Sequence, residues 1–329
     1  MEDNIVIELT LDCDKFCRHC FRSCGMTRKH EESEMEFPTL TRILDEVIWT
    51  NEHRNFRKIK SANLTGGEPI IWGRKEHTIG DGVRAVFKRG LKPRIITSST
   101  CPGDKLFDRY VSGVESLEGV GVFDVFHSFN LYMIGEGNET DKGRRIEDRL
   151  TFTIPLFDNL FGEDRHLGFL GVYDAKNREE TLTRFHEFMK GLGLKMVKSQ
   201  STRDWEKKSE QGKKVWFIYR DGSRTADGEF YPIKSCAGHA KANNLQPVAI
   251  KTQCYVLDGV GIRPTVAWDG KVYPCWEEHF PSTRPLGNLH QEHLATILGR
   301  ERAYLEDLRE RIKRGYDKGT DICKFCTEK

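Results

Sequence analysis

Three cysteines near the start of the chain have a spacing that is typical of metal ligands. Cys13, Cys17 and Cys20 lie in the stretch LDCDKFCRHCF, in the pattern C-x3-C-x2-C. Three thiols so close together cannot all pair as disulfides, so a shared metal ion or cluster explains them better. A four-iron four-sulfur (4Fe-4S) cluster normally takes four thiolates, and three from the protein leave one iron open to an outside ligand.

A predicted strand precedes each of the two sets of residues that could do chemistry. Residues 5–11, IVIELTL, lead into the cysteines, which therefore lie in a loop at the C-terminal end of a strand. Residues 58–64 form the next strand and deliver Gly66, Gly67 and Glu68 of the sequence LTGGEP. The glycines let backbone approach a ligand closely, and the carboxylate can accept a hydrogen bond from an ammonium group.

The C-x3-C-x2-C spacing, the strand before it and the GGEP stretch together resemble the radical S-adenosylmethionine (radical SAM) superfamily. The resemblance implies that SAM binds the open iron and is cleaved to methionine and a 5'-deoxyadenosyl radical. It also implies that Gly66, Gly67 and Glu68 hold the methionyl amino group. The further SAM contacts that it implies are Ser98, Ser128 and Asn130. The alternative is a zinc loop built from the three cysteines with Cys24 or His19.

A second set of cysteines lies in the C-terminal quarter, at Cys254, Cys275, Cys323 and Cys326. Residues 265–275 are predicted to form a hairpin with a type I′ turn at Asp269-Gly270, and residues 292–313 a long amphipathic helix. This pattern resembles the twitch domain, a shorter relative of the SPASM domain, because no cysteine follows Cys326 in the sequence. The resemblance implies one auxiliary 4Fe-4S cluster, and a structural zinc site is the alternative.

The fold class predicted between these sets is α/β, a partial (β/α)6 barrel followed by a small C-terminal α+β iron-sulfur domain. Strands at 93–99, 123–129, 166–173 and 195–199 follow the first two, and helices begin at Pro38, Thr78, Lys105 and Glu179. Such alternation favours parallel strands with right-handed crossovers, with chemistry at their C-terminal ends. Residues 150–161 suit either a strand or a helix. The expected domains are 1–202, a linker with a possible hairpin at 203–235, and 236–329, each cysteine set having its own core.

The composition gives few clues to partners. The chain has 52 basic and 50 acidic residues and a net charge of +2, with no apolar leader or membrane-spanning run, so we expect a cytoplasmic protein that binds neither nucleic acid nor membrane. Cys24, Cys101 and Cys236 are unassigned. We expect a radical SAM oxidoreductase that takes hydrogen from a small molecule or peptide, is reduced by a flavodoxin or ferredoxin, and oxidises its substrate by two electrons. Redox-neutral radical chemistry and a non-catalytic electron-transfer protein are the alternatives.

Overall fold

The structure is a computed structural model. It describes residues 4–13, 24, 33–53, 58–73, 76–100, 102, 105–130, 146–160, 166–173, 183–184, 187–188, 190–191, 194–198, 204–209, 214–221, 223–224, 230–231, 264–275, 285–315 and 325. Residues 128–130 and the strands between residues 166 and 231 are described by their backbone alone. None of the helices in these ranges is both long and apolar enough to cross a membrane.

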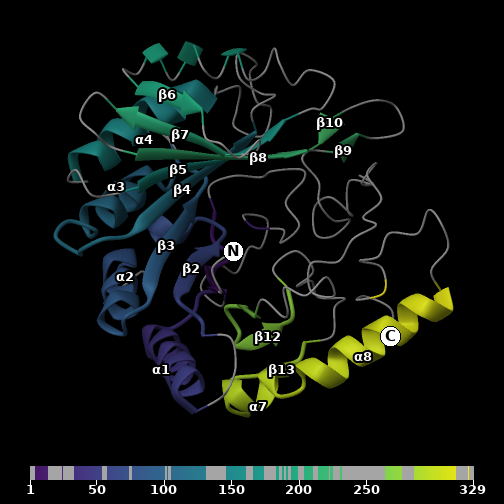
Figure 1. The fold of residues 1–329 in the computed structure, drawn as a ribbon. Helices are drawn as coiled ribbons and strands as arrows, with labels where there is room; N and C mark the ends of the chain where they lie inside the picture. Colours follow the sequence, from purple (N-terminus) through teal and green to yellow (C-terminus); the bar gives the residue numbers. More distant parts are fainter. Residues whose placement is uncertain are drawn as a thin grey trace.

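Eleven strands of the described residues form one curved sheet, in the order β13-β12-β11-β1-β2-β3-β4-β5-β8-β7-β6 (Figure 1). Its parallel centre consists of β1 (Asn4–Thr10), β2 (Ser61–Gly66), β3 (Lys92–Thr97), β4 (Asp124–Asn130), β5 (His166–Tyr173) and β8 (Lys214–Asp221). The predicted α/β partial barrel is confirmed. Every side chain of β1 from Ile5 to Thr10 is buried, as expected of a strand covered on both faces.

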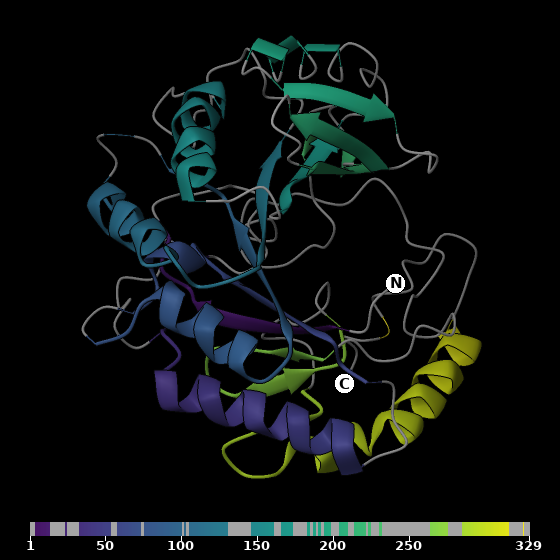
Figure 2. The same ribbon diagram turned by 60° about the vertical axis from the view of Figure 1, so that its left-hand side comes forward.

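The helices that join the strands lie side by side on the outer face of the sheet (Figure 2). They are α1 (Phe37–His53), α2 (Ile79–Lys88), α3 (Phe107–Glu115) and α4 (Ile146–Leu160). The predicted apolar face of α1 is confirmed, since Leu40, Ile43, Leu44 and Val47 are fully buried. The ambiguous segment 150–161 falls largely within α4, because burying Leu150, Ile154 and Phe157 requires the spacing of a helical face.

The sixth parallel strand differs from the prediction. Residues 195–199 were expected beside β5, but β6 (Leu194–Lys198) lies at the far edge of the sheet and pairs antiparallel with β7 (Asp204–Ser209). The neighbour of β5 is β8, which comes from the segment expected to be a linker. The range 203–235 does contain antiparallel pairs, since β7 pairs with β8, and β9 (Ser223–Arg224) pairs with β10 (Phe230–Tyr231). An antiparallel meander thus carries the chain back to the barrel.

The C-terminal segment continues the same sheet. Here β11 (Thr265–Val266) pairs parallel with β1 and antiparallel with β12 (Lys271–Tyr273), and β13 (Gly287–Asn288) follows. Apolar residues of this segment belong to the same core as β1 and α1, namely Val266, Val272, Leu289, Leu294, Ile297 and Leu298. The expectation of separate cores is therefore wrong: β11 extends the barrel sheet, and one core serves both.

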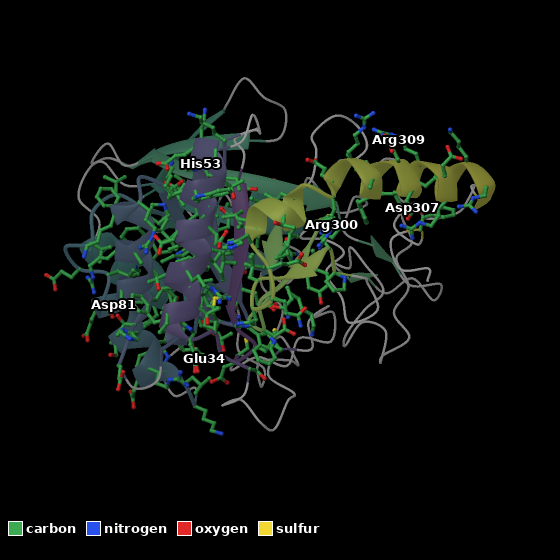
Figure 3. All side chains as sticks on the ribbon, turned by 90° about the horizontal axis from the view of Figure 1, so that it is seen from below. Glu34, His53, Asp81, Arg300, Asp307 and Arg309 are labelled. Carbon is green, nitrogen blue, oxygen red and sulfur yellow. The ribbon has the colours of Figure 1, made fainter. Side chains whose placement is uncertain are left out.

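Two local predictions for this segment also need correction. Asp269 has no positive φ, whereas Gly270 has φ +79°, and the Gly270 amide donates to the Ala267 carbonyl at 2.9 Å. The hairpin therefore has a three-residue loop that ends in a left-handed glycine, in place of a type I′ turn. The predicted helix 292–313 is divided into α7 (Leu294–Leu298) and α8 (Glu301–Gly315) at Gly299 and Arg300, and Figure 3 shows Arg300 at this junction.

Helix α1 attaches to the C-terminal segment through two polar side chains. The Glu46 carboxylate accepts a hydrogen bond from the Leu294 amide at 3.2 Å, at the start of α7, and lies 2.5 Å from Nδ1 of His293. Arg42 donates to the Leu289 carbonyl at 2.7 Å. A carboxylate at a helix N-terminus satisfies amides that have no partner within the helix. The C-terminal segment is thus attached to the barrel by a strand and by a helix cap.

Candidate metal centre

The described site residues lie along one edge of the sheet, at the C-terminal ends of β1 to β4. Thr10 is opposite Gly66 across the β1–β2 pair, and Thr97 is opposite His127 across the β3–β4 pair. Cys13 follows β1, Glu68 follows β2 and Ser98 follows β3. These three residues therefore lie where they were predicted, just after the C-terminal ends of parallel strands. Ser128 and Asn130 end β4, and their side chains are outside the described part of the structure.

The glycine stretch is in direct contact with the backbone that leads into the cysteine loop. The Gly67 amide donates to the Thr10 carbonyl, and the Glu68 amide to the Asp12 carbonyl, both at 2.7 Å. A Cβ atom at Gly66 would lie 2.1 Å from the Thr10 oxygen, and one at Gly67 would lie 2.1 Å from the Asp12 oxygen. Gly66 also has φ +135°, a backbone conformation that L side chains rarely adopt. Gly66 and Gly67 therefore allow the backbone after β2 to pack directly against the backbone of Thr10 to Asp12. This contact fixes the position at which the cysteine loop starts.

The Glu68 carboxylate is buried and accepts four hydrogen bonds. Its Oε1 atom accepts from the Ile70 amide at 3.2 Å and from the Thr97 hydroxyl at 2.8 Å. Its Oε2 atom accepts from the amide and the hydroxyl of Ser98, both at 2.9 Å. Only 1% of the residue is exposed. Glu68 therefore joins the end of β2 to the end of β3, and the prediction that it binds an ammonium group stays a prediction.

Replacing Glu68 with glutamine is expected to destabilise the cluster-free protein by about 1.5–3 kcal/mol. Glutamine has one acceptor oxygen and places an NH2 group against donors that the carboxylate now satisfies. Urea unfolding measures the loss. Glu292→Gln is the control, because the Glu292 carboxylate is paired with the partly exposed Arg300 near the surface and its loss should matter much less. Equal unfolding midpoints for the two variants would contradict this role for Glu68.

A histidine that sequence reasoning missed lies behind this edge. His127 is fully buried, its ring packs edge-on against Phe157 with centroids 5.2 Å apart, and Nδ1 lies 2.6 Å from the Ser99 hydroxyl. Ser99 has φ +64°, which is unusual for a residue other than glycine. The hydroxyl-rich stretch TSST after β3 was the available signal for Thr97 and Ser99, whereas nothing in the local pattern singled out His127.

Burial lowers the pKa of His127 from 6.5 to about 3. Between these values the unfolded chain binds a proton that the folded chain does not, so stability falls as the pH falls from about 6.5 towards 3. The expected loss between pH 7 and pH 5 is roughly 2 kcal/mol. Urea unfolding of the wild type and of His127→Gln at both values measures it as the difference between the two pH dependences. The same dependence in both proteins would contradict the assignment.

The described cysteines belong to two separate places. Cys13 and Cys275 are partly exposed, and Cys24 is buried. β11 runs parallel to β1, and β12 runs antiparallel to both. Cys13 follows β1 and Cys275 follows β12, so the two cysteines lie at opposite ends of the strands. Tyr273 is paired with Thr265, which is paired with Val6, so Tyr273 and Val6 lie at the same level of the sheet. Thr10 lies four residues beyond Val6 along β1, a distance of roughly 13 Å. They cannot bind one cluster. The other predicted ligands lie outside the described residues: Cys17, Cys20, Cys254, Cys323 and Cys326.

Comparisons with known proteins bear on the C-terminal segment and on the fold of the chain. The family model of the SPASM domain, an iron-sulfur cluster-binding domain, matches residues 260–327. The solved structure of hexahistidine-tagged anSMEcpe with bound AdoMet has a TM-score of 0.51 at 15% identity, over 91% of this chain and 77% of that one. The chain therefore shares the fold of the anSMEcpe structure, and its residues 260–327 match the SPASM domain. The SuiB structure from Streptococcus suis gives a TM-score of 0.49 at 12% identity, over 91% of this chain and 65% of that one. No curated protein sequence matches the chain.

The match to the SPASM model includes β11, β12, β13, α7 and α8. Cys275, Cys323 and Cys326 fall inside the matched range, and Cys254 precedes it. The match bears out the predicted iron-sulfur domain. The SPASM segment contributes β11 as the direct neighbour of β1, so the strand that carries the N-terminal cysteines has a SPASM strand on one side and β2 on the other.

Proposed function

We propose that this protein is a radical SAM enzyme whose N-terminal cluster is held by Cys13, Cys17 and Cys20. The observation that carries the proposal is the pair of backbone hydrogen bonds, both 2.7 Å, that join Gly67 and Glu68 to the residues just before Cys13. They bring together the two sequence motifs that such an enzyme needs, at the edge of a parallel sheet where catalytic groups collect.

The residues at this edge of the sheet have the chemistry that a 4Fe-4S cluster requires. Three thiolates would supply three of the four ligands of a 4Fe-4S cluster, and Cys13, the first of them, is partly exposed just beyond the end of β1. When bound, the cluster supplies the electron that cleaves SAM to methionine and a 5'-deoxyadenosyl radical. The Gly67 and Glu68 amides hold the residues just before Cys13, and Glu68 joins the ends of β2 and β3 through Thr97 and Ser98.

The proposed reaction removes two electrons from a small molecule or peptide. One C–H bond of the substrate breaks as the hydrogen atom joins the 5'-deoxyadenosyl radical, giving 5'-deoxyadenosine. The remaining substrate radical would lose a proton to solvent or a base, and an auxiliary cluster held by the C-terminal cysteines would accept its electron. Four cysteines, Cys254, Cys275, Cys323 and Cys326, would fill all ligand positions of that cluster, which suits an electron acceptor better than a substrate anchor. A flavodoxin or ferredoxin supplies the initial electron.

Anaerobic incubation of the reconstituted protein with dithionite and SAM tests the first step. Formation of 5'-deoxyadenosine is the expected result, and its absence in a brown, iron-loaded protein favours a non-catalytic electron-transfer protein. A colourless, zinc-containing protein would overturn the proposal. Once a substrate is found among candidate extracts by stimulated 5'-deoxyadenosine formation, the product mass tests the second step. A loss of two hydrogens per SAM cleaved supports net oxidation, and an unchanged mass refutes it in favour of redox-neutral chemistry.

A further inference from the structure

Arg109 of α3 contacts both loops of the proposed cluster site. Its Nη1 atom lies 3.1 Å from Oδ2 of Asp12, the residue directly before Cys13. Its Nη2 atom donates to the carbonyl of Ile71, at the end of the short helix η2 (Pro69–Ile71) that follows the glycine stretch. One side chain therefore spans the start of the cysteine loop and the end of the Gly66-Gly67-Glu68 turn.

Asp12 is held on three sides. Its carboxylate faces Arg109, its amide donates to the Thr10 hydroxyl at 2.9 Å, and its carbonyl accepts from the Glu68 amide at 2.7 Å. Only 5% of the residue is exposed. A carboxylate this deeply buried requires a paired cation, because losing its hydration without compensation is strongly unfavourable. The Arg109 guanidinium supplies that charge next to a proposed metal ligand.

Helix α3, which carries Arg109, is tightly packed against the rest of the site. Gly113, one turn further along α3, packs so closely on η2 that an added Cβ would lie 2.0 Å from the Ile70 oxygen. The neighbouring Tyr110 is fully buried, and its hydroxyl lies 3.3 Å from that of Thr97, which in turn donates to Glu68. Arg109 and Tyr110, which are consecutive in α3, therefore contact the residues around the cysteine loop and the hydroxyl that donates to Glu68.

We propose that Arg109 is the positioning residue of the N-terminal cysteine loop, which it fixes to the glycine turn through Asp12 and Ile71. The proposal rests on the proposed function only in taking this loop as the cluster loop. Arginine suits the role because its planar fork presents separate donors to two acceptors. Lysine would keep the charge but concentrate its donors at one point, and is expected to restore only part of the effect.

The test compares Arg109→Gln with a matched control, Arg84→Gln. Arg84 of α2 also bridges a carboxylate and a carbonyl, with Nη2 at 3.0 Å from Asp81 Oδ1 and Nη1 at 3.3 Å from the Ser116 oxygen. Its side chain is 39% exposed against 34% for Arg109. Asp81, labelled in Figure 3, lies in the first turn of α2 and belongs to no part of the proposed site. The two substitutions therefore remove similar contacts in different places.

Hydrogen exchange of the full-length, cluster-free chain is the first readout. The Gly67 and Glu68 amides donate across the contact that Arg109 supports, so their exchange should become about ten- to a hundredfold faster in Arg109→Gln and stay unchanged in Arg84→Gln. Asp12→Asn should accelerate the same amides, which keeps the test available if Arg109→Gln does not fold. Arg109→Lys should give an intermediate rate.

The reconstituted protein gives a second readout. In Arg109→Gln, a chelator should remove iron several times faster from the cluster whose electron paramagnetic resonance signal responds to SAM, whereas Arg84→Gln should behave as the wild type. Equal exchange at Gly67 and Glu68 in the wild type and in both Arg109→Gln and Asp12→Asn would overturn the role of Arg109. A wild type that holds its cluster but does not cleave SAM would overturn the proposed function alone, because the exchange comparison needs no cleavage.

Discussion

Replacing Cys13, Cys17 and Cys20 together with alanine is expected to abolish SAM cleavage while the protein still folds and keeps the iron of its C-terminal site. Without thiolates in the loop there is no cluster to supply the electron, so 5'-deoxyadenosine should fall to the level of a protein-free blank. The fold should survive because Cys13 lies beyond the end of β1, which β2 and β11 hold on both sides. Iron per chain, the resonance spectrum and 5'-deoxyadenosine are the measurements.

Cys24→Ala is the control for the triple variant. The Cys24 thiol is 4% exposed and close in sequence to the loop, and it is the cysteine that a four-ligand zinc site would use. The control should retain SAM cleavage and lose at most a modest amount of stability. Loss of all iron from the triple variant would show that the C-terminal cysteines form no independent centre.

Gly67→Ala is expected to destabilise the protein by about 3 kcal/mol and to disable the site in whatever protein remains folded. The added methyl group would lie 2.1 Å from the Asp12 oxygen and 2.9 Å from the Leu11 carbonyl carbon, and these are backbone atoms that cannot rotate away as a flexible side chain could. Relief requires separating the glycine turn from the residues before Cys13, which breaks the Gly67 and Glu68 hydrogen bonds. Urea unfolding and cluster content after reconstitution measure the two effects.

Gly191→Ala is the matched control for this change, because a Cβ at Gly191 meets nothing within 4 Å. A helical glycine replaced by alanine in open space should stabilise the protein slightly, if at all. Similar stabilities and similar cluster contents for Gly67→Ala and the wild type would mean that the two loops separate without cost, and would remove the structural basis of the proposed site.

Local sequence patterns were sufficient to predict α1, α2 and α3 and the position of Cys13, Glu68 and Ser98 at strand ends. The i, i+3, i+4, i+7 spacing in α1 corresponds to a real buried face, and Cys13, Glu68 and Ser98 follow parallel strands as expected. Such patterns depend only on which side of one element is buried. They contain no information on which strand is its neighbour, so β6 was expected in the place that β8 occupies.

The partners of the site residues could not be predicted for the same reason. The contacts of Glu68 with Thr97 and of Asp12 with Arg109 join residues 29 and 97 positions apart in the chain. Whether a carboxylate at a strand end faces a ligand or a neighbouring hydroxyl depends on distances of a few ångströms that only the packed helices and strands determine. The pairing of β11 with β1 likewise has no local signature, and it makes separate cores impossible.

The pairing of β1 with β11 also bears on how the protein folds during synthesis. Val6 is opposite Thr265, so during synthesis β1 lacks one of its two neighbours until the segment that carries Thr265 has been made. Long-range pairings of this kind slow folding. In the meantime an apolar strand presents an open edge, which is a template for aggregation. Chains truncated before residue 264 are therefore expected to aggregate through the unpaired edge of β1.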